Sequence, residues 1–481
     1  MTRRYSSVAV IGSGPAGISA LKALHDEKAF ETIRLFERRD GPGGTWNYDA
    51  VPQQFPGTYS GRDGPVQKPA TFPQKTSPAT PPDATTPTAM YSWLDTNVPA
   101  ELMAFTHTPI PDANSPISTE RYGAGNATRP YHVIAQYLAG LVNKYHESIS
   151  FNTTVVSVEK IKTGKWRLTL RQLEVYGTEA SASDTWSQED FDAVVVATGQ
   201  YSLPFLPRIP GLDEVAKTHS GALEHVNAFR SPGHYAGKKV VVLGGSFSAG
   251  DVVGDIYALV QGPLYVSQSS HSPFVTQIWN LPSVALKPTI SHIHGDRSSK
   301  LRIIFSDGSQ LEDVDRVIFA TGYRLSFPFL SPEPVLAADR LSGIYQHVFK
   351  IGDPSMAVVG LVRAPLLFRM IEYEAVAVAR YYAGNGGELP SQEDQEEWEI
   401  EQVKLKGDGY KFHDVTKEMR EHMEFLRNLA GPPAAGTDAY ELPQIADEWL
   451  EKCFSVFHLK DEYWGKVWRQ EAEKQVCKSC I

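Results

Sequence analysis

Two glycine-rich segments with the spacing of dinucleotide-binding loops begin at Gly12 and at Gly244, more than two hundred residues apart. The first follows the pattern G-x-G-x-x-G. In such a loop the first glycine permits a tight turn, the second lets the backbone approach a pyrophosphate, and the third lets helix pack on strand. The pyrophosphate lies at the helix N-terminus, where free N–H groups favour negative charge. The loop residues that we expect to contact a cofactor are Gly12, Gly14, Pro15, Ala16 and Gly17.

An acidic residue follows the first loop at the distance that ribose binding requires. Glu37 closes the apolar stretch TIRLFE, about 20 residues beyond the loop. A carboxylate there accepts hydrogen bonds from ribose hydroxyls and repels a 2′-phosphate, so the site suits FAD or NAD and disfavours NADPH. The next residues that we expect to line this cofactor are Arg38 and, in the segment GPGGTW, Gly44, Thr45 and Trp46, the last as a cover for a flat ring.

The second loop, VVVLGGSFSAGD, has small residues in place of two of the three glycines. No acidic residue follows it at ribose distance. The next apolar strand ends instead in SQSSH, residues 267–271, whose hydroxyls can hydrogen-bond a 2′-phosphate. The sequence therefore predicts NADPH here and FAD at the first loop. The residues expected to hold NADPH are Gly244, Gly245, Ser246, Ser248, Ala249 and Ser269.

Each loop is followed further along by the same apolar strand pattern, D-x-V-apolar-apolar-A-T-G. The two copies are DAVVVATG and DRVIFATG, and strands of this kind lie inside parallel sheets that are covered on both faces. The expected cofactor contacts at their ends are Thr198, Gly199, Thr321 and Gly322. Asp307-Gly308 predicts a hairpin just before the second copy.

These patterns predict an α/β protein with two Rossmann-like dinucleotide-binding domains, the NADPH domain being inserted in a discontinuous FAD domain. The expected ranges are 1–202 and 324–481 for the FAD domain and 203–323 for the NADPH domain. The proline-rich segment 51–88 is expected to be an extended surface loop without regular helix or strand. Beyond about residue 360 the apolar pattern is mostly helical.

Composition narrows the class of protein. A formal net charge of −10 argues against broad nucleic-acid binding. The apolar stretch near the N-terminus is too short for a signal peptide or membrane span, and three cysteines form no disulfide framework, so we expect a cytoplasmic protein. The C-terminal CKSC could be a redox dithiol, but a frayed tail is the favoured interpretation, and His292 and His294 are interpreted as a half-exposed strand pair rather than metal ligands. The oligomeric state is left open, a homodimer included.

Taken together, the motifs resemble those of the flavin-containing monooxygenases, particularly their short fungal-type members. The first loop, GGTW, the second loop and FATGY stand in that family's order and rough spacing. HSGALEHVNAF resembles the family signature F-x-G-x-x-x-H-x-x-x-[Y/F], with His225 in place and His219 where the family has Phe. TNVPAELMAF resembles the active-site segment, and by that resemblance Asn97 is the asparagine beside the flavin ring. NTTVVSVEK resembles the strand whose backbone meets adenine near Val155.

The resemblance implies NADPH- and O₂-dependent oxygenation of a nitrogen or sulfur centre in a small molecule, through a flavin hydroperoxide, without a metal. Asn97 would hydrogen-bond the flavin adduct or bound NADP⁺. A Baeyer–Villiger enzyme is disfavoured, since Phe229-Arg230 stands where Trp-Pro is expected, and an N-hydroxylating enzyme of secondary metabolism stays open. A flavin disulfide reductase ranks low, because all three cysteines lie after residue 450. An FAD-containing interaction protein without activity is the alternative outside enzymology.

Overall fold

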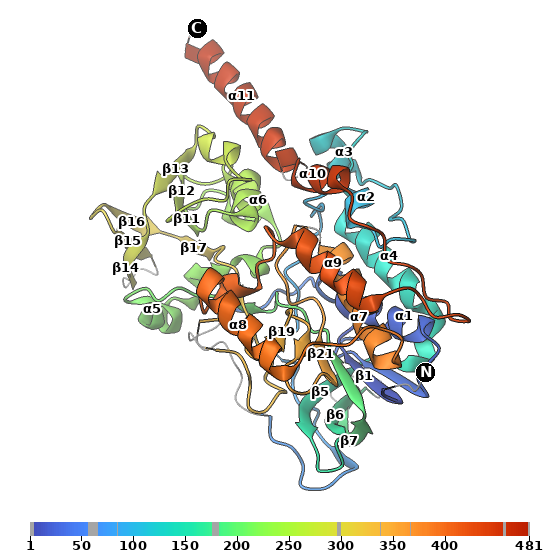
Figure 1. Ribbon diagram of the computed structural model, residues 1–481. Helices are drawn as coiled ribbons and strands as arrows, with labels where there is room; N and C mark the ends of the chain where they lie inside the picture. Colours follow the sequence, from blue (N-terminus) through green and yellow to red (C-terminus); the bar gives the residue numbers. More distant parts are fainter. Residues whose placement is uncertain are drawn as a thin grey trace.

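The computed structural model describes residues 4–55, 66–83, 85–175, 182–295, 300–336, 338–365, 367–455 and 458–479, with side chains described as far as residue 470. Two α/β units lie side by side, as Figure 1 shows. The main sheet of the second unit is parallel, and that of the first is parallel except at β20 (Phe349–Lys350), which pairs antiparallel with its two neighbours. Helices of the C-terminal part cover the first unit, and the last helix reaches across to the second.

The first unit contains a seven-stranded sheet in the order β19-β20-β21-β8-β1-β2-β4. The central strands β8, β1 and β2 pair in parallel, and Val8, Ala9 and Val10 of β1 are fully buried. Continuous burial is typical of strands covered on both faces. The strands are β1 (Ser7–Ile11), β2 (Thr32–Phe36), β4 (Ile149–Ser150), β8 (Ala193–Val196), β19 (Ile344–Tyr345), β20 (Phe349–Lys350) and β21 (Met356–Val358).

Alternate residues of β1 face different layers, as expected for a strand. Val8 and Val10 pack with helices, whereas Ala9 and Ile11 pack with an antiparallel sheet of order β3-β7-β6-β5. The helices of this unit are α1 (Pro15–Asp26), α4 (Tyr131–Val142), α7 (Leu367–Ala383) and α9 (Met419–Ala430). The strands of the antiparallel sheet are β3 (Gln74–Thr76), β5 (Thr153–Lys160), β6 (Trp166–Glu174) and β7 (Ser183–Phe191).

The second unit contains a five-stranded parallel sheet, β10-β17-β11-β12-β13, and a three-stranded antiparallel sheet, β14-β15-β16. The predicted Asp307-Gly308 hairpin joins β15 to β16, and Gly308 has a φ of +82°. The strands are β10 (Leu223–His225), β11 (Val240–Leu243), β12 (Leu264–Ser267), β13 (Val284–Lys287), β14 (Ile290–Gly295), β15 (Leu301–Phe305), β16 (Gln310–Val314) and β17 (Arg316–Phe319). Its helices are α5 (Leu212–Thr218) and α6 (Phe247–Ile256).

The second unit interrupts the first along the chain. Strands β19, β20 and β21 follow it in sequence but lie in the same sheet as β1. The two connections between the units run together as a short antiparallel pair, β9 (Leu203–Pro204) with β18 (Tyr323–Arg324). The predicted fold class, an α/β protein with one Rossmann-like unit inserted in the other, is confirmed.

The proline-rich segment differs from its prediction at one place. Residues 74–76 form strand β3, which pairs antiparallel with the edge of β7. This stretch lies between Pro73 and Pro78 and contains no proline itself, so its backbone can pair at a sheet edge, where prolines are tolerated. The Trp186 indole also donates to Thr76 Oγ1 (3.0 Å). Residues 66–73, 77–83 and 85–88 are irregular, and 56–65 and 84 lie outside the described residues.

The remaining helices connect or cover the two units. The α-helices are α2 (Ala100–Met103), α3 (Pro116–Tyr122), α8 (Gln392–Lys406), α10 (Asp447–Ser455) and α11 (Leu459–Ser479). The 3₁₀ turns are η1 (Gly44–Trp46), η2 (Asn143–Ser148), η4 (Ser220–Ala222), η5 (Val226–Ala228), η6 (Pro232–Tyr235), η7 (Gln277–Asn280) and η8 (Tyr410–His413). In the part of the chain that the structure describes, no helix combines the length and apolar character needed to cross a membrane.

Candidate active site

The glycines of the first loop occupy positions that a larger residue could not take. Gly12 has a φ of +100°, and a Cβ there would lie 2.7 Å from the Ala197 carbonyl oxygen. A Cβ on Gly17 would lie 1.8 Å from Gly12 O. Gly14 is the N-cap of α1, and among the described residues no side chain caps this end of the helix. The first-turn N–H groups are therefore free of side-chain partners, which fits the diphosphate of a dinucleotide.

Glu37 follows β2 and is tied to the first loop. Its Oε2 accepts from Ser13 N (2.7 Å) and Ser13 Oγ (2.8 Å), and its Oε1 accepts from Arg39 N (2.9 Å). The residue is only 5% exposed. Because a carboxylate oxygen has two lone pairs, Oε1 keeps one acceptor position without a partner among the described residues. The carboxylate thus closes the loop and can still accept from one ribose hydroxyl.

The GPGGTW segment lies directly against the first loop. Gly43 and Gly44 both have positive φ, and a Cβ on Gly44 would lie 2.8 Å from Gly14 Cα. Thr45 and Trp46 follow in η1. The Trp46 ring packs edge-on against Phe368 of α7, with ring centroids 6.1 Å apart. The structure brings the two glycine motifs together and places Trp46 where α7 begins.

Strand β5 lies beside Glu37, and its ladder is irregular near Val155. Thr153 N donates to Glu37 O (2.8 Å), and the register between β5 and β6 shifts between Val155 and Ser157. A bulge of this kind leaves backbone groups out of the strand ladder. This position, next to the ribose carboxylate, is compatible with backbone contacts to an adenine ring.

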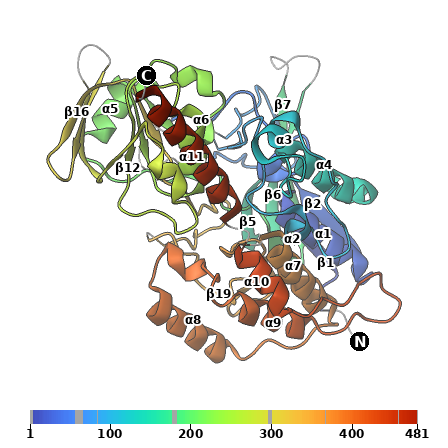
Figure 2. The ribbon, with the colours of Figure 1, turned by 90° about the horizontal axis from the view of Figure 1, so that it is seen from above.

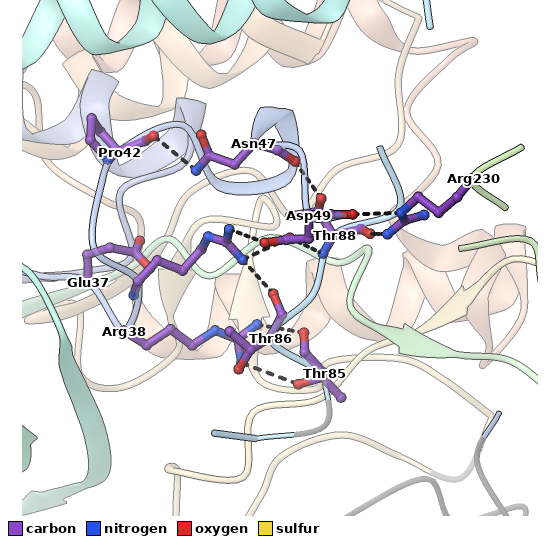
Figure 3. A network of polar contacts seen from close by, with 10 residues as sticks. Glu37, Arg38, Pro42, Asn47, Asp49, Thr85, Thr86, Thr88 and Arg230 are labelled. Atoms are coloured by element: carbon purple, nitrogen blue, oxygen red, sulfur yellow. Dashed lines mark hydrogen bonds and ion pairs between the residues drawn. The ribbon is translucent and has the colours of Figure 1, made fainter. Parts of the chain in front are cut away.

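Arg38 and Arg39 bind the proline-rich segment (Figure 3). Arg38 donates to Thr85 Oγ1 (3.2 Å) and Thr85 O (2.9 Å). Arg39 pairs with Asp49 through two N–H groups (2.7 and 3.1 Å) and donates to Thr86 O (2.8 Å). The guanidinium of Arg38, expected at the cofactor, is therefore engaged by residue 85.

Arg230 of the second unit binds the same segment from the other side. Its Nε donates to Asp49 O (2.7 Å) and one terminal nitrogen donates to Thr88 O (2.6 Å), as Figure 3 shows. Its other terminal nitrogen donates to Asn227 O (2.8 Å) and Phe229 O (2.9 Å). No sequence pattern indicates this role, since all four acceptors are backbone carbonyls. Arg230 links the two units through the proline-rich segment.

The second glycine loop joins β11 to α6. Gly244 has a φ of +137°, and a Cβ there would lie 2.4 Å from Ala320 O. Ser246 is the N-cap of α6 without a side-chain cap, Ser248 is exposed and Ala249 is fully buried. The segment after β12 lies over the loop, since a Cβ on Gly245 would meet Ser270 O at 2.4 Å. Ser269 is exposed beside it.

The two ATG segments end buried strands. Thr198 and Gly199 follow β8 and are exposed. Thr321 and Gly322 follow β17 and lie at the connection between the units, where Thr321 Oγ1 donates to the carbonyl oxygen of residue 205. Gly322 O accepts from the backbone N–H of residue 205 (2.9 Å) and also faces His225 Nε2 (3.0 Å).

His225 is a neutral buried donor at this connection. Its Nδ1 accepts from Asn227 N (3.3 Å), so Nε2 carries the proton and donates to Gly322 O. The side chain is 1% exposed, and burial lowers the pKa of His225 to about 4. The signature histidine therefore fixes the second ATG segment rather than acting as an acid or base.

We expect His225 to make the fold acid-labile. The stability that neutral His225 contributes is fully present above its ordinary pKa of about 6.5 and is lost as the pH falls through about 4. Between pH 7 and pH 5 the loss is about 2 kcal/mol. In His225→Gln the amide keeps a donor and an acceptor but does not titrate. The pH-dependent decrease in unfolding free energy, measured by chemical denaturation, should be smaller than in the wild type by that amount. An equal decrease in both proteins would contradict this role, and exposed His146→Gln is the control.

Asn97 lies in the loop before α2 and is half-buried. Thr96 fixes this loop, because its Oγ1 accepts from Arg129 N (3.0 Å) and donates to Val98 O (2.8 Å). No residue that the structure describes hydrogen-bonds the Asn97 carboxamide. The half-buried amide therefore lies next to the hydrogen-bonded Thr96, and its own donors and acceptor have no partner among the described residues.

The structure describes the side chains of one of the three cysteines and of both histidines of the predicted strand pair. Cys453 is fully buried in α10, and burial raises the pKa of its thiol to about 12. The side chain of Cys477 and all of Cys480 lie outside the described part. His292 and His294 are exposed on β14 with stacked rings, and the described residues contain no group of three His, Cys, Asp or Glu placed to hold a metal ion.

Two family models match the chain. Residues 6–259 match the model described as pyridine nucleotide-disulphide oxidoreductase, and residues 281–432 match the model described as flavin-binding monooxygenase-like. The range 6–259 contains no cysteine, so it holds no dithiol for disulfide chemistry.

Proteins of known function resemble the chain over nearly its whole length. Flavin-containing monooxygenase FMO GS-OX-like 7 of Arabidopsis thaliana is 31% identical over 462 residues, covering 93% of this chain and 87% of the relative. Flavin-containing monooxygenase ustF2 of Aspergillus flavus is 25% identical over 494 residues, covering 92% and 95%. The solved structure of S-allyl-L-cysteine S-oxygenase from Allium sativum shares the fold, with a TM-score of 0.71, 22% identity and coverage of 99% and 100%. The chain therefore belongs to the flavin-containing monooxygenase family and is an enzyme that uses FAD and NADPH.

Proposed function

We propose that this enzyme uses NADPH and O₂ to oxygenate a soft sulfur or nitrogen centre of a small molecule through a flavin hydroperoxide. The observation that carries the proposal is the pair of uncapped helix N-termini at α1 and α6, of which only the first has a buried ribose carboxylate, Glu37. FAD supplies the oxygen chemistry when bound. The residues of the chain bind, orient and shield it.

The proposed FAD site lies in the first unit, with domain ranges 1–202 and 324–481. The α1 N-terminus takes the diphosphate, Glu37 takes a ribose hydroxyl, and the bulge at Val155 takes the adenine edge. The half-buried Asn97 carboxamide, which has no partner among the described residues, is the proposed active-site group.

The proposed NADPH site lies in the second unit, residues 203–323. In this proposal the α6 N-terminus takes the diphosphate, and Ser269, which is exposed, binds the 2′-phosphate. No carboxylate is present in SQSSH to repel that phosphate. We therefore expect kcat/KM for NADPH to exceed that for NADH at least about tenfold, a difference of about 1.4 kcal/mol.

Sulfur is the first substrate class to test, because the Allium sativum neighbour is named for S-oxygenation of S-allyl-L-cysteine. Purified enzyme with NADPH and O₂ should convert a small thioether, a thiol or a tertiary amine to a product one oxygen atom heavier, measured by mass spectrometry. A lactone or ester from a ketone would instead indicate the Baeyer–Villiger alternative. NADPH oxidation that is absent with every compound, with the flavin staying oxidised, would contradict the proposal.

A further inference from the structure

A turn that leads into the Asn97 loop is buried against the second unit. Tyr91 and Trp93 lie in this turn, which is closed by a hydrogen bond from Leu94 N to Tyr91 O (3.1 Å). Their rings pack against Phe229, with centroid distances of 5.6 and 5.8 Å. Because Phe229 follows η5 of the second unit, the turn joins the two units by direct contact.

Two carboxylates of α6 accept from the polar groups of this turn. Tyr91 Oη donates to Asp251 Oδ2 (2.9 Å). Trp93 Nε1 donates to Asp255 Oδ2 (2.7 Å). The aspartates are four residues apart in the sequence GDVVGD and lie on one face of the helix. The turn is thus bonded to the helix that begins at the proposed NADPH loop.

Basic groups from two other segments pair with the same carboxylates. Arg121 lies 2.8 Å from Asp255 Oδ1, and Lys460 Nζ lies 3.0 Å from Asp251 Oδ2. The Asp255 side chain is only 3% exposed, so burial raises its pKa while Arg121 opposes that rise. Removing one member of such a pair leaves a buried charge uncompensated. The two ion pairs therefore hold α6 firmly at the contact.

Helix α11, which carries Lys460, makes a further contact with α6, and Figure 2 shows α11 crossing over α6. Gly254 lies between the two aspartates, and a Cβ there would come 1.9 Å from the Trp464 ring. Asp461 accepts from Thr276 N (2.6 Å) and Gln277 N (2.7 Å), beside η7. The position of α6 is set by three separate segments of the chain.

We propose that Asp251 and Asp255 are positioning residues for the oxygenation reaction, because they fix the Asn97 loop to the helix that begins at the NADPH loop. Only three residues separate Trp93 from Asn97. Two of these are themselves fixed, since Asp95 Oδ1 accepts from Ser118 Oγ (2.7 Å) and Thr96 binds Arg129. The position of the carboxamide depends on α6 through this short connection. The inference rests on the active-site role proposed for Asn97.

The test removes the two hydrogen bonds and keeps the aromatic rings. In Tyr91→Phe with Trp93→Phe, the ion pairs of both aspartates with Arg121 and Lys460 stay in place. We expect unchanged FAD content and anaerobic flavin reduction by NADPH within about twofold of the wild type, but an about fivefold lower ratio of oxygenated product to hydrogen peroxide. If the double variant cannot be obtained as folded protein, Trp93→Phe alone provides the same test. Tyr373→Phe, which removes a buried hydroxyl bonded to Pro443 O (2.6 Å), is the matched control.

The Asn97→Ala background separates positioning from general destabilisation. If the turn acts through Asn97, adding the two phenylalanines there should change the product-to-peroxide ratio no further. A second, independent decrease would overturn the inference, as would a wild-type ratio in the double variant while Asn97→Ala is uncoupled. A wild-type ratio in Asn97→Ala itself would instead contradict the role proposed for Asn97 in the oxygen-dependent step, while oxygenation by the enzyme would stand.

Discussion

Glu37→Arg is expected to give a folded protein that purifies with little or no FAD. The wild-type carboxylate accepts three hydrogen bonds, two from Ser13 and one from Arg39 N, and an arginine can accept none. It would also place a third cation beside Arg38 and Arg39. Hydrogen bonds to a charged group contribute about 1.5–3 kcal/mol each, so the loss of the loop contacts and of the ribose contact should weaken FAD binding by 10²-fold or more, roughly.

The measurement is the flavin-to-protein ratio by absorbance, followed by titration with FAD. Glu37→Gln keeps one acceptor oxygen, so its flavin-to-protein ratio should lie between those of the wild type and Glu37→Arg. Exposed Glu147→Arg makes the same change of charge away from the loop and should retain full flavin. If Glu37→Arg carried a full complement of FAD, the assignment of the first loop would be wrong. If Glu37→Arg instead lost its FAD because it did not fold, as judged by circular dichroism, the FAD content of Glu37→Gln would provide the test.

The first glycine loop and Glu37 could be predicted because their signals are local. The turn, the uncapped helix and the acidic strand end follow one another along the chain, and each has its own residue requirement. The same holds for β8 and β17, whose continuous apolar character shows burial on both faces. The resemblance to the monooxygenase family, carried by these motifs, is confirmed by relatives that cover most of the chain.

What could not be predicted depends on contacts between distant segments. The sequence around Asp251 does not indicate its partners, because Tyr91 and Lys460, which bind its carboxylate, lie far away along the chain. The repeated Gly-Asp spacing in GDVVGD was a usable signal, because each glycine leaves room for a neighbouring side chain. Gly254 faces the Trp464 ring, and Gly250 faces Val275. Arg230 offered no such signal, since backbone carbonyls exist at every position.

The proline-rich segment was the part of the fold predicted least well, and the reason is physical. Proline density argues against a helix or a central strand, but a short proline-free stretch can still pair at an exposed sheet edge, as β3 does. Its irregular remainder is held by Arg39 and Arg230, whose acceptors include backbone carbonyls at residues 86 and 88. Composition predicts such a segment to be extended but does not show what binds it.

Asn97→Ala is expected to keep FAD and its reduction by NADPH, while most NADPH consumption ends as hydrogen peroxide. The carboxamide has no hydrogen-bond partner among the described residues, whereas neighbouring Thr96 is fully engaged with the backbone. Loss of one preorganised donor at a reacting centre typically costs about 10²-fold in the step that it supports. Oxygenated product per NADPH should therefore fall steeply, with KM for NADPH nearly unchanged.

Asn97→Ala should change the fraction of NADPH that yields oxygenated product, the coupling, and should leave folding unchanged. Asn97 contributes no hydrogen bond to the described part of the protein, so its truncation leaves no buried group unpaired and should not lower the unfolding temperature. Exposed Asn143→Ala is the matched control and should keep wild-type coupling. Product, peroxide and NADPH must be measured together, because a slower enzyme with an unchanged product-to-peroxide ratio would mean that Asn97 acts on flavin reduction. That result would move its role from the oxygen-dependent half of the reaction to the NADPH-dependent half.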